Sequence, residues 1–325
     1  MKAIITGAAG FIGAALIKSM VSNGWEVLGI DNFSPYYSVD LKRARLQDVE
    51  QHLKTLDRLD AFKFREMDCL ELTLDSGEVR GECADIIVHL AAQPGVAASQ
   101  RVPERYLRDN VTVFMHMLEQ VRQSGTPMVF ASSSTVYGEQ GCVSLEKSRI
   151  DKPLSVYGAT KSCNEILAAA YSRSFGLSLT GLRFFSVYGP WGRPDMFYYI
   201  ATKSILEHKI ISINGDGTIR RDMTYIADAV NVLETTVNEG VSNSDGFLVY
   251  DVGFGNVVSV SEIIELVSNH LGITAEIEHQ KARSYDMAET LANNIHPLYI
   301  NGYKSVSINE GSWRFVDWIK SYGRY

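Results

Sequence analysis

The segment KAIITGAAGFIG, residues 2–13, decides the fold that we expect for this chain. A short β-branched run ends in glycines spaced as GxxGxxG, and an amphipathic stretch begins directly after the second glycine. Such glycines permit a tight turn and a close approach of backbone to a pyrophosphate, while the following helix N-terminus offers N–H donors. A glycine-rich turn with a purely structural role has the same pattern, so residues further along the chain must decide between the two.

Asp31 supplies that context, because it ends the second apolar run, 18 residues after Gly13. A carboxylate at this place accepts hydrogen bonds from the hydroxyls of a cofactor ribose. It also repels the 2′-phosphate of NADP, which favours NAD. Taken alone, Asp31 could equally be a solvated turn residue beside Asn32. Strand, glycines, helix and acid together predict dinucleotide binding.

The next residues of the chain continue the alternation of short apolar runs and longer amphipathic stretches. We expect strands at residues 3–6, 26–30, 62–66, 85–90, 127–132 and 177–184, and helices at residues 11–22, 105–124 and 157–174. Strands that alternate with helices form βαβ units and a parallel sheet covered on both faces. We therefore predict an α/β fold, with a Rossmann-type doubly wound sheet in residues 1–186. Residues 187–325 should form a smaller mixed α/β substrate-binding lobe, with some chain crossing back to the sheet.

Composition restricts the partners and the compartment. The net charge of −7 argues against a nucleic-acid or anionic-membrane surface. We find no apolar run of about 18 residues, so we expect no membrane span, and the N-terminal apolar run is too short for a signal peptide. The four cysteines are scattered without a metal-ligand pattern, which predicts reduced thiols, a cytoplasmic location and no metal site.

Ser133, Tyr157 and Lys161 are candidates for the chemistry. The fifth expected strand runs into a cluster of hydroxyls at residues 132–135, at the sheet edge where such folds bind ligands. Tyr157 and Lys161 lie four residues apart, on one face of an expected helix. A free phenol titrates at about pH 10, but a nearby ammonium and a nicotinium charge both favour the phenolate. A serine-rich loop is usually just solvated, and a bare YxxxK arises by chance, so only the combination predicts a reaction centre.

These motifs resemble those of the extended short-chain dehydrogenase/reductases that act on nucleotide sugars, and most of all the NAD-dependent UDP-glucuronate 4-epimerases. The resemblance covers nearly the whole chain. Besides GxxGxxG and YxxxK, it rests on residues 36–46 (YYSVDLKRARL), 89–93 (HLAAQ) and 183–196 (RFFSVYGPWGRPDM). The first and last of these segments are the most specific to the glucuronate branch.

The resemblance implies a reaction and a set of roles. Tyr157 is the base, Lys161 holds the nicotinamide ribose, and Ser133 lies beside the sugar O4. C4 is inverted through a transient 4-keto sugar, with NAD accepting and returning a hydride. The cofactor site implied in this way comprises Gly7, Gly10, Phe11, Ile12, Gly13, Asp31, Asn32, Lys42, Asp68, Leu90, Ala91, Ala92, Tyr157 and Lys161.

Substrate contacts follow from the chemistry and from the same resemblance. A 4-keto-glucuronate is a β-keto acid, so its carboxylate must be held out of alignment with the carbonyl to prevent loss of carbon dioxide. Ser134, Thr135 and Ser186 are donor candidates, and Arg193 is the candidate cation, although a surface salt bridge or loop anchor explains Arg193 equally well. Arg221, Arg283 and Asp286 match contacts to the UDP phosphates and ribose, and either arginine could instead be a surface residue.

Departures from the family pattern bear on the choice of sugar. The usual Gly-Val-Arg is Gly95-Val96-Ala97 here, and Arg101 is a candidate replacement for the missing cation. Ser284-Tyr285 and Asp251 also differ, standing where the family has Pro-Gly and Asn. Epimerisation of UDP-glucose or UDP-N-acetylglucosamine is therefore the second hypothesis, followed by UDP-glucuronate decarboxylation and by a non-catalytic NAD-binding scaffold.

Some further expectations concern neighbouring activities and surfaces. Sugar-nucleotide dehydratases need Asp-Glu where this chain has Ser134-Thr135, which argues against dehydration. We read residues 42–45 as a solvated helix face, from which Lys42 could reach the adenosine. Tyr171 and Phe175 are expected in the core. The resemblance also implies a homodimer formed by the helices at residues 105–124 and 157–174.

Overall fold

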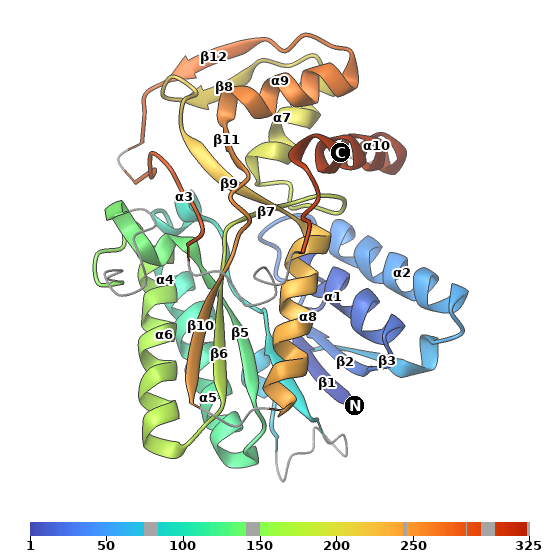
Figure 1. Ribbon diagram of the computed structural model, residues 1–325, viewed down its shortest axis with the longest axis vertical. Coiled ribbons are helices and arrows are strands. Elements are labelled where there is room, and N and C mark those ends of the chain that lie inside the picture. The colour runs from blue at the N-terminus through green and yellow to red at the C-terminus, as the bar shows by residue number, and fades with distance from the viewer. Residues whose placement is uncertain (75–83, 141–149, 243–245, 284, 294–302, 324–325) are drawn as a thin grey trace.

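The structure, a computed structural model, describes residues 1–74, 84–140, 150–242, 246–283, 285–293 and 303–323 (Figure 1). Within these residues, seven strands form one sheet in which every neighbouring pair is parallel. In spatial order the strands are β10 (Phe247–Val252), β6 (Leu179–Phe184), β5 (Met128–Ser133), β4 (Ile86–His89), β1 (Lys2–Thr6), β2 (Glu26–Asp31) and β3 (Phe62–Glu66). The strand order reverses between β1 and β4, and ligands of such sheets bind at this crevice.

The central strands are apolar on both faces, which explains why they form the middle layer of a three-layer domain. Ile4 and Ile5 are neighbours in β1, yet they belong to different core clusters, one on each side of the sheet. Val88 and Ile87 in β4 divide in the same way. Alternating side chains point to opposite faces, so each strand contributes to both cores.

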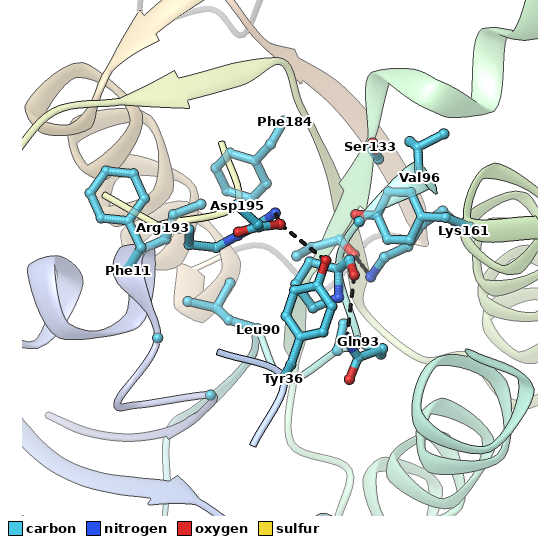
Figure 2. A pocket seen from close by; sticks show the side chains of 18 of the residues that line it. Phe11, Tyr36, Leu90, Gln93, Val96, Ser133, Lys161, Phe184, Arg193 and Asp195 are labelled. Carbon is cyan, nitrogen blue, oxygen red and sulfur yellow. Dashed lines mark hydrogen bonds and ion pairs between the residues drawn. The ribbon is translucent and has the colours of Figure 1, made fainter. Parts of the chain in front are cut away.

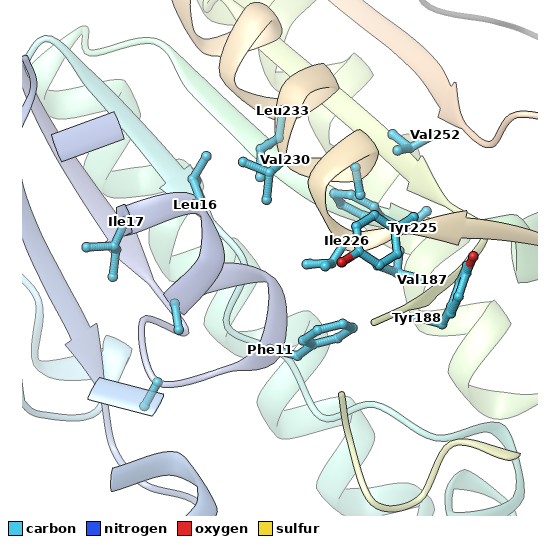
Figure 3. Packing of buried hydrophobic residues seen from close by; sticks show 14 of the residues in the cluster. Phe11, Leu16, Ile17, Val187, Tyr188, Tyr225, Ile226, Val230, Leu233 and Val252 are labelled. Atoms are coloured by element: carbon cyan, nitrogen blue, oxygen red, sulfur yellow. The ribbon is translucent and has the colours of Figure 1, made fainter. Parts of the chain in front are cut away.

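Helices cover both faces of this sheet (Figure 1). On one face lie α1 (Phe11–Ser22), α2 (Val39–Thr55) and α8 (Ile226–Ser242), and on the other lie α5 (Val113–Ser124) and α6 (Val156–Phe175). Leu16 of α1 faces Val230 and Leu233 of α8 across the first of these cores (Figure 3). The fold class expected from the sequence is confirmed.

The helix expected at residues 105–124 is more complex than predicted. It consists of α4 (Pro103–Tyr106), a π-helical turn η4 (Leu107–Thr112) and α5. The π turn carries Asn110, whose side-chain oxygen accepts from the Gln93 backbone N–H at 2.7 Å and whose amide nitrogen donates to Thr160 at 3.0 Å. π turns of this kind often occur at functional sites, and this one joins the end of β4 to α6.

A smaller lobe covers the carboxyl edge of the large sheet (Figure 1). Its described residues form two small sheets, of which the first orders β11 (Val257–Ser259), β9 (Arg220–Tyr225) and β7 (Ser186–Tyr188), and the second pairs β12 (Ile277–Gln280) with β8 (Ile211–Asn214). Its helices are α7 (Phe197–Leu206), α9 (Val260–Leu271) and α10 (Ile308–Tyr322). The short helices elsewhere are η1 (Leu59–Ala61), η2 (Cys69–Glu71), α3 (Val96–Ser99) and η5 (Ser134–Gln140).

The two lobes are interleaved along the chain. α8 and β10 follow residue 187, yet both belong to the large sheet and its helical cover, so the chain leaves the sheet after β6 and returns to it. The division at residue 186 stays a prediction. Among the described residues, no helix combines the length and the apolar character that crossing a bilayer requires.

Candidate active site

A cavity of about 480 Å³ is lined by residues at the carboxyl ends of the large sheet's strands and by residues of the small lobe. It contains almost every site residue that the sequence predicted. The members of that set that line the cavity are Gly7, Gly10, Phe11, Ile12, Gly13, Asp31, Asn32, Lys42, Asp68, Leu90, Ala91, Ala92, Ser133, Ser134, Thr135, Tyr157, Lys161, Ser186, Arg193, Arg221 and Asp286. Arg283 is not among the lining residues; its side chain is exposed and lies over the Tyr285 ring.

The glycine turn has no room for side chains. Gly7 has φ +73°, and a Cβ there would lie 2.8 Å from the Ala91 backbone nitrogen at the end of β4. A Cβ on Gly13 would overlap the Gly7 carbonyl oxygen. Helix α1 begins after Gly10 without a side-chain cap, and its first residues, Phe11 and Ile12, line the cavity. A bare helix N-terminus behind a close-packed turn suits a diphosphate.

Asp31 ends β2 directly beside this turn. Its two carboxylate oxygens accept from the Ala9 backbone N–H at 3.1 Å and the Phe33 backbone N–H at 2.8 Å. The Lys42 ammonium lies 3.9 Å away, and burial lowers the pKa of Lys42 although Asp31 acts in the opposite direction. The carboxylate is therefore fixed in orientation at the place where the sequence predicted the ribose acceptor.

Asp68 lines the same end of the cavity as Asn32, one of its hydrogen-bond partners. Asp68 accepts from Arg108 at 2.9 Å, from Asn32 at 3.2 Å and from the Leu70 backbone N–H at 3.0 Å. Burial opposes ionisation of Asp68, but these hydrogen bonds outweigh it and lower the pKa of the carboxyl. Arg108 also lines the cavity, and its guanidinium is the cation beside Asp68; sequence reasoning missed this residue. Arg101, the replacement that we considered, is exposed and outside the lining set.

The three catalytic candidates converge at the carboxyl end of β5. Ser133 is the last residue of that strand, and its hydroxyl accepts from the Thr135 hydroxyl at 2.9 Å. Tyr157 lies in the first turn of α6, which Ser155 caps. Burial raises the pKa of the Tyr157 phenol, while the Arg193 guanidinium and a hydrogen bond with Ser133 act to lower it. Arg193, which the sequence had placed only at the substrate, thus acts to favour the phenolate of Tyr157.

Lys161 is deeply buried, and its ammonium donates to the Ala131 carbonyl oxygen at 2.8 Å. Burial lowers the pKa of Lys161 from its ordinary 10.5 to about 8, although Glu165 acts to raise it. The folded protein therefore holds this proton less tightly than the unfolded chain does. The resulting cost to stability is fully present below about pH 8 and disappears as the pH rises toward 10.5.

Replacing Lys161 with methionine should therefore raise the free energy of unfolding at about pH 7, by up to about 3 kcal/mol, because 1.36 kcal/mol corresponds to one pKa unit. The gain should shrink to below about 1 kcal/mol when urea unfolding is repeated at about pH 10, because the lysine of the folded protein is then neutral and that of the unfolded chain is near its ordinary pKa of 10.5. Lys54→Met, at an exposed position of α2, should show no such pH-dependent gain. An equal effect of Lys161→Met at both pH values would contradict this account.

Behind the catalytic candidates lies a buried polar network. Arg183 donates to both oxygens of Glu165, at 2.9 and 2.7 Å, and also to the Tyr137 hydroxyl at 2.8 Å. Tyr137 in turn donates to Asp251 at 2.6 Å, and Ser132 donates to Glu165 at 2.5 Å. Asp251, which stands where the family usually has asparagine, thus accepts a hydrogen bond from the Tyr137 hydroxyl inside the core. The network joins β5, β6, β10 and α6 immediately beneath the cavity floor.

Of the charged residues at 42–45, Arg43 is exposed as we expected, but Lys42 and Arg45 are not part of a solvated face. Arg45 is 1% exposed, and its guanidinium donates to the carbonyl oxygens of Trp191 (3.0 Å), Gly192 (3.3 Å) and Ala9 (3.2 Å). Lys42 is also buried. The interpretation was wrong for these two residues because charged side chains on a helix are usually solvated. Here the carbonyl groups of two loops hold Arg45, and Asp31 lies beside Lys42.

The substrate side of the cavity carries two arginines of the small lobe, Arg193 and Arg221. Arg193 pairs with Asp195, and Arg221 of β9 donates to the Met287 carbonyl oxygen at 2.8 Å. Burial lowers the pKa of Arg221, while Asp286 acts to raise it. Tyr36 and Asp195 also line the cavity, and sequence reasoning assigned them no role. Tyr36 lies in the family-specific segment 36–46 and Asp195 in the segment 183–196, so their place in these segments was the sequence feature that could have indicated a role.

The chain has relatives of known name and structure. Residues 3–253 match the family described as NAD dependent epimerase/dehydratase. Protein CapI of Staphylococcus aureus is 36% identical, with 99% of each chain covered. UDP-glucuronate 4-epimerase 2 of Arabidopsis thaliana is 37% identical over 99% of this chain and 76% of its own length. The UDP-glucuronic acid 4-epimerase of Bacillus cereus, solved with UDP-glucuronic acid and NAD, is 31% identical, has a TM-score of 0.87, and is matched over 99% of this chain and all of its own.

Proposed function

Because the chain belongs to the NAD dependent epimerase/dehydratase family, we propose that it converts UDP-glucuronate to UDP-galacturonate by inverting C4, with NAD as its cofactor. One observation carries this proposal. Ser133 and Tyr157 line the same cavity as the glycine turn and as Arg193, so a hydroxyl pair, a dinucleotide cradle and a cation face one space (Figure 2). The relatives named for this reaction share the fold over nearly the whole chain.

The residues present fit NAD. The glycine turn leaves a cradle that a Cβ would fill, and the bare N-terminus of α1 faces it. Asp31 offers carboxylate oxygens to an unmodified ribose, and Lys161, near the start of α6 with Tyr157, lines the same cavity. When bound, NAD supplies the hydride acceptor and donor for C4 of the sugar.

Tyr157 and Ser133 perform the proton transfers. We assign Tyr157 as the base that takes the proton from O4, because its phenol interacts with Ser133 at the end of β5. Ser133 then holds O4 in line with that phenol. After the 4-keto sugar has turned its other face, Tyr157 returns the proton to O4, now with inverted configuration.

The cavity also has the groups needed to hold the sugar carboxylate. Arg193 supplies a cation, and Ser134, Thr135 and Ser186 supply hydroxyl donors from two neighbouring strand ends. Held away from alignment with the C4 carbonyl, the carboxylate of the β-keto acid is retained rather than lost as carbon dioxide. On the other side, we assign Arg221 to the UDP phosphates and Asp286 to the ribose; the exposed Arg283 would have to fold inward to join them.

The experiment that tests this proposal is an NMR time course with purified protein and UDP-glucuronate, run in parallel with UDP-glucose and UDP-N-acetylglucosamine. We expect UDP-galacturonate to form without release of carbon dioxide. Turnover of the neutral sugars alone would overturn the uronate assignment but keep the chemistry. Release of carbon dioxide would indicate a decarboxylase, and no turnover of any sugar would indicate an NAD-binding scaffold.

We also propose that the protein is a cytoplasmic homodimer that pairs through the outer face of α6. The free thiols of Cys69 and Cys163, the two cysteines in the described part of the chain, support a reducing compartment. Ile166 and Phe175 of α6 are 57% and 52% exposed, so Phe175 is not the core residue that we expected. Leu107, beside α5, is exposed as well. Exposed apolar side chains favour an interface, and Ile166 is the one that lies at the middle of α6.

Ile166→Asp should convert such a dimer to a monomer, because it buries a charge at the middle of the proposed interface. Sedimentation velocity or light scattering at several protein concentrations measures the change. Ile277→Asp, at an exposed position of β12 away from these helices, is the matched control and should leave the assembly intact. A wild-type protein that is monomeric, or a dimer that survives Ile166→Asp, would contradict the proposed interface.

A further inference from the structure

Arg193 has one edge of its guanidinium already occupied. Its Nε donates to Asp195 Oδ1 at 3.0 Å, and its Nη2 donates to Asp195 Oδ2 at 2.8 Å. Both side chains are about one-quarter exposed, at 24% and 26%. A bidentate pair of this kind fixes the plane of the guanidinium as well as its position. The pair uses the Nε–Nη2 edge, which leaves Nη1 outside it and available to a ligand in the cavity.

Tyr36 holds Asp195 from a different loop. Its hydroxyl donates to Asp195 Oδ2 at 3.1 Å, and Figure 2 shows Asp195 between Tyr36 and Arg193. Tyr36 lies between β2 and α2, whereas Asp195 lies between β7 and α7. Gly95, after β4, permits this approach, because a Cβ there would overlap the Tyr36 phenol oxygen. Three loops that are distant in sequence thus meet around the Tyr36 hydroxyl.

The backbone that carries Arg193 is braced separately. Trp191, two residues earlier, has φ +66°, a left-handed conformation that costs a non-glycine residue about 1–2 kcal/mol. Arg45 of α2 donates to the carbonyl oxygens of Trp191 and Gly192, which holds the loop in this conformation. The base of the loop is therefore fixed by Arg45, and the end of the Arg193 side chain is fixed by Asp195.

At neutral pH, the charge states of Asp195 and Tyr36 allow these two residues to hold the Arg193 guanidinium in place. Burial opposes ionisation of Asp195, but the Arg193 guanidinium and the hydrogen bonds from Arg193 and Tyr36 outweigh it and lower the pKa of the carboxyl. Burial and the neighbouring Asp195 raise the pKa of the Tyr36 phenol, so it remains a donor. An ionised, doubly hydrogen-bonded carboxylate can hold a cation in place without losing its own orientation.

We propose that Asp195, held by Tyr36, is a positioning residue that fixes Arg193 so that its Nη1 meets the sugar carboxylate, and that this clamp sets the preference for a uronate over a neutral sugar. The inference rests on the proposed function, since it assigns a task to Arg193 only if the substrate carries a carboxylate. It adds a selectivity role for two residues that do not themselves need to touch the reacting atoms.

The test measures binding of UDP-glucuronate and of UDP-glucose to the NAD-loaded protein by calorimetry, together with kcat and KM for the uronate. Asp195→Ala should weaken UDP-glucuronate binding by about 10- to 100-fold and raise its KM, because an orienting partner is lost. UDP-glucose binding should change by less than about 3-fold, because it makes no ion pair. Tyr36→Phe should shift uronate binding in the same direction by a smaller factor. Glu310→Gln, which breaks an exposed pair with Arg314 on α10, is the matched control.

A double variant separates positioning from a general structural effect. In an Arg193→Met background, Asp195→Ala should cause no further loss of uronate binding, because the two residues act through one guanidinium. A further loss in that background, or an equal loss for both sugars, would overturn the clamp. If wild-type protein prefers UDP-glucuronate and Asp195→Ala keeps that preference, the clamp alone fails. If wild-type protein shows no preference for the uronate, the uronate part of the proposed function fails first and the clamp with it.

Discussion

Tyr157→Phe should reduce kcat for 4-epimerisation by about 10³-fold, within the range of about 10²- to 10⁴-fold that a positioned proton-transfer group contributes. The substitution removes one oxygen from the group that interacts with Ser133 and changes little else at the start of α6. NAD and UDP-glucuronate should still bind, since the glycine turn and the arginines are untouched. Single-turnover kinetics combined with calorimetry would measure both effects on the same preparation.

Tyr171→Phe is a suitable control, because it removes a phenol oxygen from the same helix where that oxygen contacts Glu119 instead of the cavity. The pH dependence gives a second readout. Burial raises the pKa of Tyr157, so the phenolate fraction, and with it kcat/KM, should rise as the pH increases from about 6 to about 9. Full activity of Tyr157→Phe, or a wild-type rate that falls over this pH range, would contradict its assignment as the base.

Gly13→Ala should weaken NAD binding by about 10- to 100-fold, because forcing a methyl group into close-packed backbone costs about 1–3 kcal/mol. The added Cβ would overlap the Gly7 carbonyl oxygen, so the turn or the start of α1 must move away from the cofactor cradle. Titration of the protein with NADH, followed by fluorescence, measures the loss. Epimerase activity should fall in parallel and recover partly at high NAD concentration.

Gly176→Ala separates loss of stability from loss of binding. Gly176 ends α6 with φ +68°, and a Cβ there would meet nothing within 4 Å. Alanine at this position should therefore lower stability by about 1 kcal/mol through backbone strain and leave the affinity for NAD unchanged. If Gly13→Ala binds NAD as tightly as wild type, the glycine turn is not the cofactor cradle that we describe.

Local patterns predicted much of the fold. The helix expected at residues 11–22 is α1 with the same ends, because the glycine turn defines its start and its apolar stripe defines its length. The expected strands match β1 to β6 within a residue or two at most ends. β10 was missed: its residues 247–252 follow a stretch full of turn signals, and its partner β6 lies more than 60 residues earlier. Parallel pairing of distant strands leaves little local trace.

The candidate site was predictable where a short motif carries the geometry, as with Gly7, Asp31 and Tyr157. It was not predictable where the geometry joins distant loops. Tyr36 and Asp195 are 159 residues apart, and nothing in either segment announces their hydrogen bond. The prediction for Arg45 was wrong for a related reason. A charged residue on a helix is expected to be exposed to solvent, and its carbonyl partners come from loops that the local sequence does not identify.

The most direct test of the central claim, inversion through hydride transfer at C4, uses UDP-glucuronate that carries deuterium at C4. The protein should convert it to UDP-galacturonate that keeps the deuterium at C4, because a hydrogen transferred as hydride to a bound cofactor and back stays bound to carbon and does not exchange with water. NMR and mass spectrometry of the product in ordinary water would measure this retention. Product that has exchanged its C4 deuterium for a solvent proton would contradict the account.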